Sequence, residues 1–252
     1  MDLMTVLGLV IGLGAVYIVM YCGKIVHLLF NPMAALLVFG GTFGATLITY
    51  QFRVLKAAPL VIFRVLFPPK SLQPEVVINK IVELAESAKR SGKSALQSEV
   101  ETSKDKFLKD GIQMLLDGLD PTIIRENLEK TIIFTRRRHQ QVSAVFRTMG
   151  TYAPIFGLLG TLIGVVQVLQ NISDPASMGA SMAIAVTTTF YGIFGTNFVF
   201  LPITGKLESQ SNEEMINCEV VIEGILAIEK GDIPIIVKRK LESFLAYQAR
   251  SK

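Results

Sequence analysis

The sequence is poor in charged residues, and the scarcity is uneven. Asp, Glu, Lys and Arg make up 18% of the 252 residues, against about a quarter in a typical soluble domain. Three stretches, 3–22, 33–50 and 148–204, contain a single charged residue between them, Asp174. Half of the chain is hydrophobic, which excludes a disordered protein. The sequence therefore predicts a membrane protein with a water-exposed part attached.

The apolar stretches are long enough for membrane helices. A spanning helix needs about 20 residues to cross a hydrocarbon core of about 30 Å. The stretch 3–22 has this length, and 33–50 is expected to extend by a residue or two on each side. The segment 148–204 accommodates two spans, which turn-forming residues divide at a predicted hairpin, 171–177. We therefore predict four transmembrane helices.

Basic residues predict the orientation of these helices. Of the 25 Lys and Arg residues, 17 lie in 51–147 and 7 in 205–252. Because basic residues beside membrane spans stay in the cytoplasm, we expect both segments and both termini on the cytoplasmic side. The net charge of +4 reflects this bias, and no nucleic-acid partner is expected. The run Arg136-Arg137-Arg138-His139 is interpreted as a helix end near anionic lipid headgroups, with phosphate binding as the alternative.

The cytoplasmic segments have helical periodicity. Apolar residues recur at helical spacing between Pro74, which suits the first turn of a helix, and Gly92, which suits its end. A second helix is predicted to end near Gly118, and a third continues towards the third span without a breaker before Gly150. We predict an all-α integral membrane protein. It has four transmembrane helices, a helical cytoplasmic domain (51–147) between spans two and three, and a helical C-terminal tail (205–252) interrupted near Gly231.

Cysteine and histidine are too few and too dispersed for common catalytic or metal sites. Cys22 and Cys218 are predicted on opposite sides of the membrane, as are His27 and His139, and no C-x-x-C motif is present. The sequence also lacks a spacing typical of a nucleophile and base or of metal ligands. We expect no enzyme, no resident metal and no cofactor.

Small and hydroxyl-bearing residues mark the spans. Thr161 lies among glycines of the third span, and Ala185, Thr189, Gly192 and Thr196 form a stripe along the fourth. These hydroxyls can bond to carbonyls of their own helices, which is the commoner arrangement, or line a path for a hard cation. Gly-x-x-x-Gly motifs, which permit close packing within the chain or between copies, occur in three spans, at Gly8–Gly12, Gly40–Gly44 and Gly160–Gly164.

No Asp, Glu, Lys, Arg or His lies within the four predicted spans. Ion-driven membrane proteins usually keep such a group in the bilayer. If this chain conducts ions, the titrating carboxylate must come from a partner subunit; otherwise it conducts nothing. Pro154 and Pro202 each remove a helical hydrogen bond, to the carbonyls of Gly150 and Phe198, and so create either a hinge or a static kink.

Together these features resemble the A subunit of the bacterial flagellar stator, the MotA/PomA family, and most closely its sodium-type branch. The resemblance covers nearly the whole chain and is strongest between 146 and 207. It rests on Met1-Asp2-Leu3, Val82-Glu83-Leu84-Ala85, Lys89-Arg90-x-Gly92, Ala153-Pro154, Gly160-Thr161-Leu162-Ile163-Gly164, and Thr188-Thr189-Phe190-Tyr191-Gly192 through Pro202.

The resemblance implies a ring of five A subunits in the bacterial inner membrane. This ring surrounds two B subunits (MotB/PomB-like), whose transmembrane helix supplies the ion-binding Asp. Ion passage would rotate the ring, and its cytoplasmic domains would push on the switch-ring protein of the flagellar rotor. The alternatives are a proton-driven stator, an ExbB/TolQ-type energiser of an outer-membrane process, which usually has three spans, and a passive membrane scaffold.

The same resemblance implies roles for individual residues. Thr161, Thr188 and Thr189 match the threonines of the sodium pathway, and Pro154 and Pro202 match the prolines that couple ion passage to movement.

The rotor contact is implied in the cytoplasmic domain. Lys89 or Arg90 fits the basic position of this contact. The acidic position is Gln97 here, which departs from the family, and Glu99 and Glu101 lie close enough to replace it.

Overall fold

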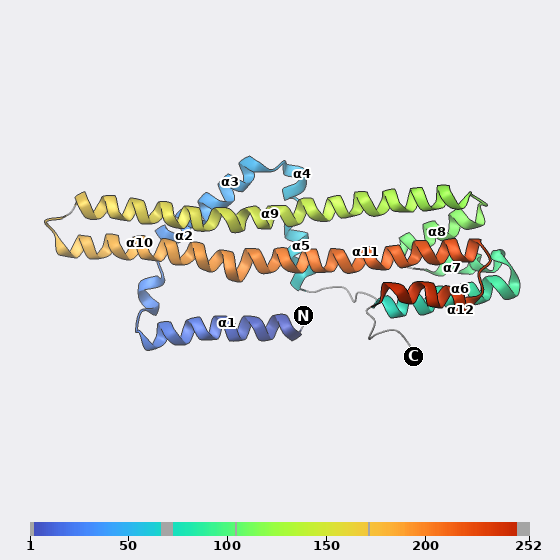
Figure 1. The fold of residues 1–252 in the computed structure, drawn as a ribbon. Coiled ribbons are helices and arrows are strands. Elements are labelled where there is room, and N and C mark those ends of the chain that lie inside the picture. Colours follow the sequence, from blue (N-terminus) through green and yellow to red (C-terminus); the bar gives the residue numbers. More distant parts are fainter. Residues whose placement is uncertain (1–2, 67–72, 104, 171, 246–252) are drawn as a thin grey trace. The chain divides into compact units, whose positions relative to one another are not determined.

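In a computed structural model of the chain, the described residues, 3–66, 73–103, 105–170 and 172–245, are almost entirely helical (Figure 1). The chain divides into two compact units. We call the first, residues 1–69 and 140–208, the membrane unit, and the second, residues 70–139 and 209–252, the cytoplasmic unit, after the location predicted from the basic residues. Two long helices, α9 (Pro121–Gln170) and α11 (Leu201–Glu229), contribute residues to both units.

Four helical segments are long and apolar enough to cross a membrane, as predicted. The first is α1 (Leu3–Cys22), followed by a 3-10 turn (Val26–Leu29). The second joins α2 (Pro32–Ala35), a π-helical turn (Leu36–Gly40) and α3 (Gly41–Thr49). The third lies in α9, and the fourth joins α10 (Pro175–Gly195), a π-helical turn (Thr196–Phe200) and the start of α11.

The second span confirms its expected extension at the N-terminal end but not at the C-terminal end. Its N-terminus begins one residue earlier, because the Asn31 side chain accepts hydrogen bonds from the Met33 and Ala34 amides and Pro32 occupies the first turn. The expectation that this span continues beyond Tyr50 is wrong. The backbone of Tyr50 has a β conformation, so the helix ends at Thr49. Two short helices, α4 (Phe52–Leu55) and α5 (Ala58–Leu66), follow within the membrane unit.

The cytoplasmic unit follows the predicted helix boundaries. Helix α6 (Pro74–Ser91) begins at the expected proline and ends at Gly92, whose φ of 79° requires glycine. A 3-10 turn (Lys93–Leu96), α7 (Gln97–Thr102) and α8 (Lys106–Leu116) precede α9. After α11, the tail continues through α12 (Pro234–Leu241) and a 3-10 turn (Glu242–Phe244).

Large aliphatic side chains form the core of the cytoplasmic unit. Full burial of one such side chain stabilises a fold by about 1.5–3 kcal/mol. Two glycines admit these side chains: a Cβ at Gly111 would lie 2.2 Å from the end of Ile225, and one at Gly224 would lie 2.3 Å from Ile81. The most fully buried members come from α6, the turn before α7, α8, α9, α11 and α12, and include Ile78, Ile81, Leu96, Ile112, Ile124, Leu128, Met215, Ile225 and Leu241.

Candidate functional site

Helices α9 and α10 approach so closely that glycine is required at their contact. A Cβ at Gly157 would lie 2.9 Å from the carbonyl oxygen of Thr188, and one at Gly192 would lie 2.6 Å from that of Ala153. A Cβ at Gly164 would lie 2.5 Å from the Ala185 side chain. The glycines of the third span therefore serve packing within the chain.

The glycines of the first two spans behave differently. Added Cβ atoms at Gly8 and Gly44 would meet no described atom within 4 Å, and one at Gly40 would meet only Leu36 of its own span. Gly12 and Gly41 are exceptions, because a Cβ at Gly12 would lie 2.7 Å from the Phe198 ring and one at Gly41 would collide with the Phe156 ring of α9. In these spans most of the Gly-x-x-x-Gly positions are thus left open for contacts outside the chain.

Two of the three predicted threonines meet where α9 and α10 touch. The hydroxyls of Thr161 and Thr189 form a short hydrogen bond to each other. Thr161 Oγ1 also lies 3.2 Å from both the Gly157 and the Ala185 carbonyl oxygens, and Thr189 Oγ1 lies 3.4 and 3.5 Å from the same two atoms. Two hydroxyls and two carbonyls therefore form a half-buried cluster of four neutral oxygens, which we call the threonine cluster.

Thr188 lies outside this cluster. Its side chain is fully buried, and its hydroxyl donates to the Ala185 carbonyl of the preceding turn at 2.8 Å. It packs against Gly160, where a Cβ would lie 2.5 Å from the Thr188 Cβ. The structure thus makes Thr188 a packing residue within the chain, while Thr161 and Thr189 are only partly buried.

The threonine cluster suits a hard cation but does not neutralise its charge. Hydroxyl and carbonyl oxygens are the ligand types that hard cations prefer. No group of His, Cys, Asp or Glu within the described ranges is arranged to hold a metal ion. The threonine cluster itself contains no carboxylate.

The two prolines have different surroundings. Pro154 interrupts the hydrogen bonding of α9, and the Gly150 carbonyl that it frees accepts a hydrogen bond from Thr196 Oγ1 at 2.9 Å. Pro202 is the second residue of α11, just after the π-helical turn, and Thr204 Oγ1 donates to the Phe200 carbonyl there at 2.9 Å. The sequence contained Thr196 in the small polar stripe, but only the tertiary structure pairs it with the carbonyl that Pro154 leaves free.

A polar network that sequence reasoning missed ties α9 to its neighbours. Arg147 forms an ion pair with Glu208 of α11, and Ser143 Oγ donates to the same carboxylate at 3.2 Å. Tyr50, which follows the second span, donates its hydroxyl to the Ala144 carbonyl at 2.9 Å. Thr148 Oγ1 lies 2.7 Å from the same phenol oxygen. These contacts lie where the second predicted span ends and the third begins, and periodicity carries little information on side-chain pairing there.

The residues predicted to contact the rotor are not equivalent. Lys89 and Arg90 are exposed in the last turn of α6, and Arg90 lies 3.7 Å from Glu86. Glu101 is exposed on α7. By contrast, Glu99 is 15% exposed and pairs with Lys80 at 2.8 Å. Glu101 is therefore better placed than Glu99 for an external contact.

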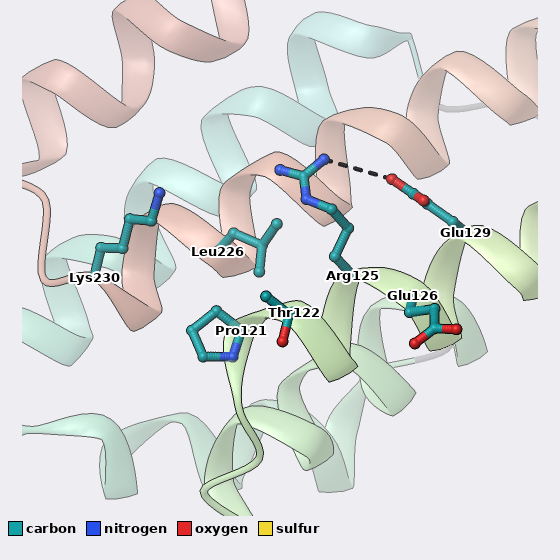
Figure 2. A pocket seen from close by; sticks show the side chains of 7 residues that line it. All are labelled: Pro121, Thr122, Arg125, Glu126, Glu129, Leu226 and Lys230. Atoms are coloured by element: carbon teal, nitrogen blue, oxygen red, sulfur yellow. Dashed lines mark ion pairs between the residues drawn. The ribbon is translucent and has the colours of Figure 1, made fainter.

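A shallow pocket in the cytoplasmic unit lies where α9 begins beside the end of α11 (Figure 2). The Arg125 guanidinium there pairs with Glu223 at 2.7 Å and Glu129 at 3.5 Å, and the hydrogen bond to Glu223 is the main cause of its raised pKa. None of the lining residues carries a thiol or imidazole. The pocket is lined by Pro121, Thr122, Arg125, Glu126, Glu129, Leu226 and Lys230.

Comparison with known proteins identifies the family. The profile of the MotA/TolQ/ExbB proton channel family matches residues 99–220. The chemotaxis protein PomA of Vibrio alginolyticus is 36% identical over 97% of this chain and 96% of its own length. This chain belongs to the MotA/TolQ/ExbB family. Motility protein A of Bacillus subtilis is 33% identical, with 100% and 94% of the two chains covered.

Solved structures agree with this membership in the MotA/TolQ/ExbB family. The flagellar MotAB stator complex of Bacillus subtilis contains a chain that is 32% identical with a TM-score of 0.89, covering 97% of this chain and 96% of that one. C. jejuni MotAB matches at 26% identity and a TM-score of 0.90, with 100% and 99% covered. The resemblance to MotA/PomA stator subunits is therefore confirmed, and the chain is a channel component rather than an enzyme.

Proposed function

We propose that this MotA/PomA-type stator subunit uses sodium to drive the flagellar rotor. The observation that carries the proposal is the threonine cluster, in which Thr161 and Thr189 meet over the Gly157 and Ala185 carbonyls. Four neutral oxygens can replace part of the hydration shell of a sodium ion. A proton needs no such set of ligands, although it does need a titrating group.

The threonine cluster has no negative charge to balance that of a bound cation, and this lack indicates which kind of partner subunit is needed. We infer that a MotB/PomB-like B subunit places its transmembrane Asp beside the threonine cluster and completes the ion site. The similarity to the MotAB complexes of Bacillus subtilis and C. jejuni supports this assignment. The A subunits form a ring, with five copies as the family resemblance implies, in the bacterial inner membrane with both termini in the cytoplasm. The open faces of Gly8 and Gly44 support assembly of the spans with further helices.

Coupling begins beside the prolines. The hydrogen bond from Thr196 to the Gly150 carbonyl joins the π-helical turn of the fourth span to the proline-containing turn of α9. A change at the threonine cluster, on the same pair of helices, would reach both Pro154 and Pro202. We propose that bending of the helices at Pro154 and Pro202 drives the cytoplasmic unit against the switch-ring protein. Lys89, Arg90 and Glu101 contact that protein.

Sodium dependence of rotation tests the proposal. Cells carrying this chain and its cognate B subunit are tethered, and rotation speed is measured while potassium replaces sodium at constant pH. Rotation should stop without sodium, and Thr189→Val should raise the sodium concentration for half-maximal speed several-fold. The matched control is Thr151→Val, which changes an exposed threonine of α9.

Two outcomes would redirect the assignment. Rotation that persists without sodium and stops on addition of a protonophore would identify a proton-driven stator, which is the alternative within the same family. Restoration of an outer-membrane uptake process, without any effect on motility, would identify an ExbB/TolQ-type energiser.

A further inference from the structure

Helix α9 carries an exposed surface that is both basic and apolar. Ile133 and Phe134 are 49% and 60% exposed, and the Arg137 guanidinium lies 5.7 Å from the centre of the Phe134 ring. Arg136, Arg137 and Arg138 are all exposed, and none of them forms an ion pair with any residue that the structure describes. We call these five residues the basic face of α9.

Helix α11 carries an exposed surface of opposite charge. Glu213 and Glu219 are exposed and form no ion pair within the described part of the chain. Ile216 lies between them in sequence and is 38% exposed. We call these three residues the acidic face of α11. The neighbouring Glu214 is turned towards His139 instead, at 3.9 Å.

Helices α9 and α11 run antiparallel, and the basic face and the acidic face lie at the same level along the length of this pair. His139 of α9 contacts Ser211 of α11 at 3.1 Å, and Arg125 contacts Glu223 at 2.7 Å. The basic face lies between Arg125 and His139 of α9. The acidic face lies between Ser211 and Glu223 of α11. Figure 1 shows the two helices running side by side. His139 and Ser211 join the two helices, and the basic face and the acidic face form no ion pair with each other in the described part of the chain.

We propose that the basic face of α9 in one copy packs against the acidic face of α11 in the next copy around the stator ring. This inference rests on the proposed ring. Rotation about an axis along the helices keeps every residue at its own height, so Phe134 meets Ile216 and Arg137 meets Glu213. The contact uses different surfaces on the two copies, and such head-to-tail contacts close into rings. Charge complementarity prevents two identical faces from pairing.

The position of the arginines argues against the lipid contact expected from the sequence. They lie inside α9 rather than at a helix end. Arg137 is 11 residues before Thr148, the first residue of the predicted third span, which corresponds to about 16 Å along a helix. Electrostatic attraction to headgroups is screened over about 8–10 Å at physiological ionic strength.

Disulfide formation between copies tests the proposed contact. Two differently tagged chains, one with Phe134→Cys and one with Ile216→Cys, are co-expressed with the B subunit in a Cys22→Ser background. The native Cys218 is left in place, because burial raises its pKa to about 12. Linked heterodimers should form when both variants are present and remain at background with either alone.

The possible failures are distinguishable. Rings of normal mass in native mass spectrometry without the Phe134→Cys to Ile216→Cys link would overturn this contact and leave the proposed function intact. Phe134→Cys chains linked to each other would overturn it in favour of a two-fold contact. Unmutated chains that form no ring and support no rotation would contradict the proposed function itself.

Charge reversal gives a second measurement. We expect Arg137→Glu to raise the concentration at which rings half-dissociate by roughly two- to tenfold, and Glu213→Arg in the same chain to restore assembly. The matched control is Arg239→Glu, which reverses an exposed charge on α12. Equal loss in Arg137→Glu and the control, or no rescue by Glu213→Arg, would overturn the proposed contact. Anionic vesicles that bind the unmutated ring but not Arg137→Glu rings of normal stability would assign the arginines to lipid instead.

Discussion

The glycines at the contact between α9 and α10 serve a different purpose from those in the core of the cytoplasmic unit. In the membrane unit, Gly157 and Gly192 let one helix backbone touch another. In the cytoplasmic unit, Gly111 and Gly224 make room for isoleucine side chains. The difference follows from the solvent. Lipid tails do not drive apolar side chains together, so membrane helices gain by close backbone packing. Water does drive such burial, so the cytoplasmic unit gains by enclosing large side chains.

The largest expected effect lies in the cytoplasmic core. Ile81→Ala removes a side chain that is fully buried against Gly224, and such truncations destabilise by about 2–5 kcal/mol. Thermal unfolding of the detergent-solubilised complex measures the loss. Ile235→Ala, at a position that is 59% exposed, is the control and should change stability by less than about 0.5 kcal/mol. Equal losses would remove the distinction between core and surface in this unit.

The membrane contact should be sensitive to a single methyl group. Gly192→Ala would place a Cβ 2.6 Å from the Ala153 carbonyl oxygen, a backbone atom that cannot move alone. We expect a loss of about 1–3 kcal/mol and greatly reduced motility in soft agar. Gly179→Ala, in the same helix with no described atom within 4 Å, should be tolerated. Normal motility of Gly192→Ala cells would show that α9 and α10 are not held this closely.

The carbonyl freed by Pro154 allows a smaller and more specific test. Thr196→Val keeps the side-chain shape but removes the donor to the Gly150 carbonyl, which should cost about 0.5–1.5 kcal/mol. If this bond couples the helices, torque should fall more than assembly does. Thr42→Val is the matched control, since the Thr42 hydroxyl is buried and bonds only within its own span. Identical torque in the two variants would contradict the coupling role.

The smallest expected effect concerns the reactivity of the Cys218 thiol. Burial, followed by the nearby Glu214, Asp105 and Glu219 carboxylates, raises the pKa of Cys218 to about 12. The thiol therefore stays protonated and unreactive throughout the neutral range, because only the thiolate is nucleophilic. Maleimide labelling at pH 7 to 9 should modify the exposed Cys22 and spare Cys218. Rapid labelling of Cys218 would indicate that this part of the cytoplasmic unit opens.

Sequence reasoning succeeded where a local rule decides the outcome. The four apolar stretches, the start of α6 at Pro74 and its end at Gly92 depend on hydrophobicity, proline and glycine alone. The end of the second span at Thr49 was missed, because nothing in its composition marks the extended conformation of Tyr50. The arginine run was misplaced at a helix end, because charge density alone does not show that α9 continues through it.

Which of the candidate threonines lie together could not be predicted from the sequence, for a similar reason. The family resemblance implied that Thr161, Thr188 and Thr189 all belong to the ion pathway. The packing of α10 on Gly160 buries Thr188 and leaves the other two at the helix contact. Glu99 was an equally good candidate in sequence until its pairing with Lys80 became visible. Pairing of this kind depends on helix rotation and crossing, which a periodic pattern leaves undetermined.

By itself, the sequence determined that this protein is helical, crosses the membrane four times and carries no ionisable group in its spans. Those properties follow from residue chemistry and helix length. Only the tertiary structure decided which hydroxyls meet, that Thr196 satisfies the carbonyl freed by Pro154, and that α9 and α11 expose opposite charges at one height. These outcomes depend on distances between residues far apart in the chain, and the packing of whole helices sets those distances.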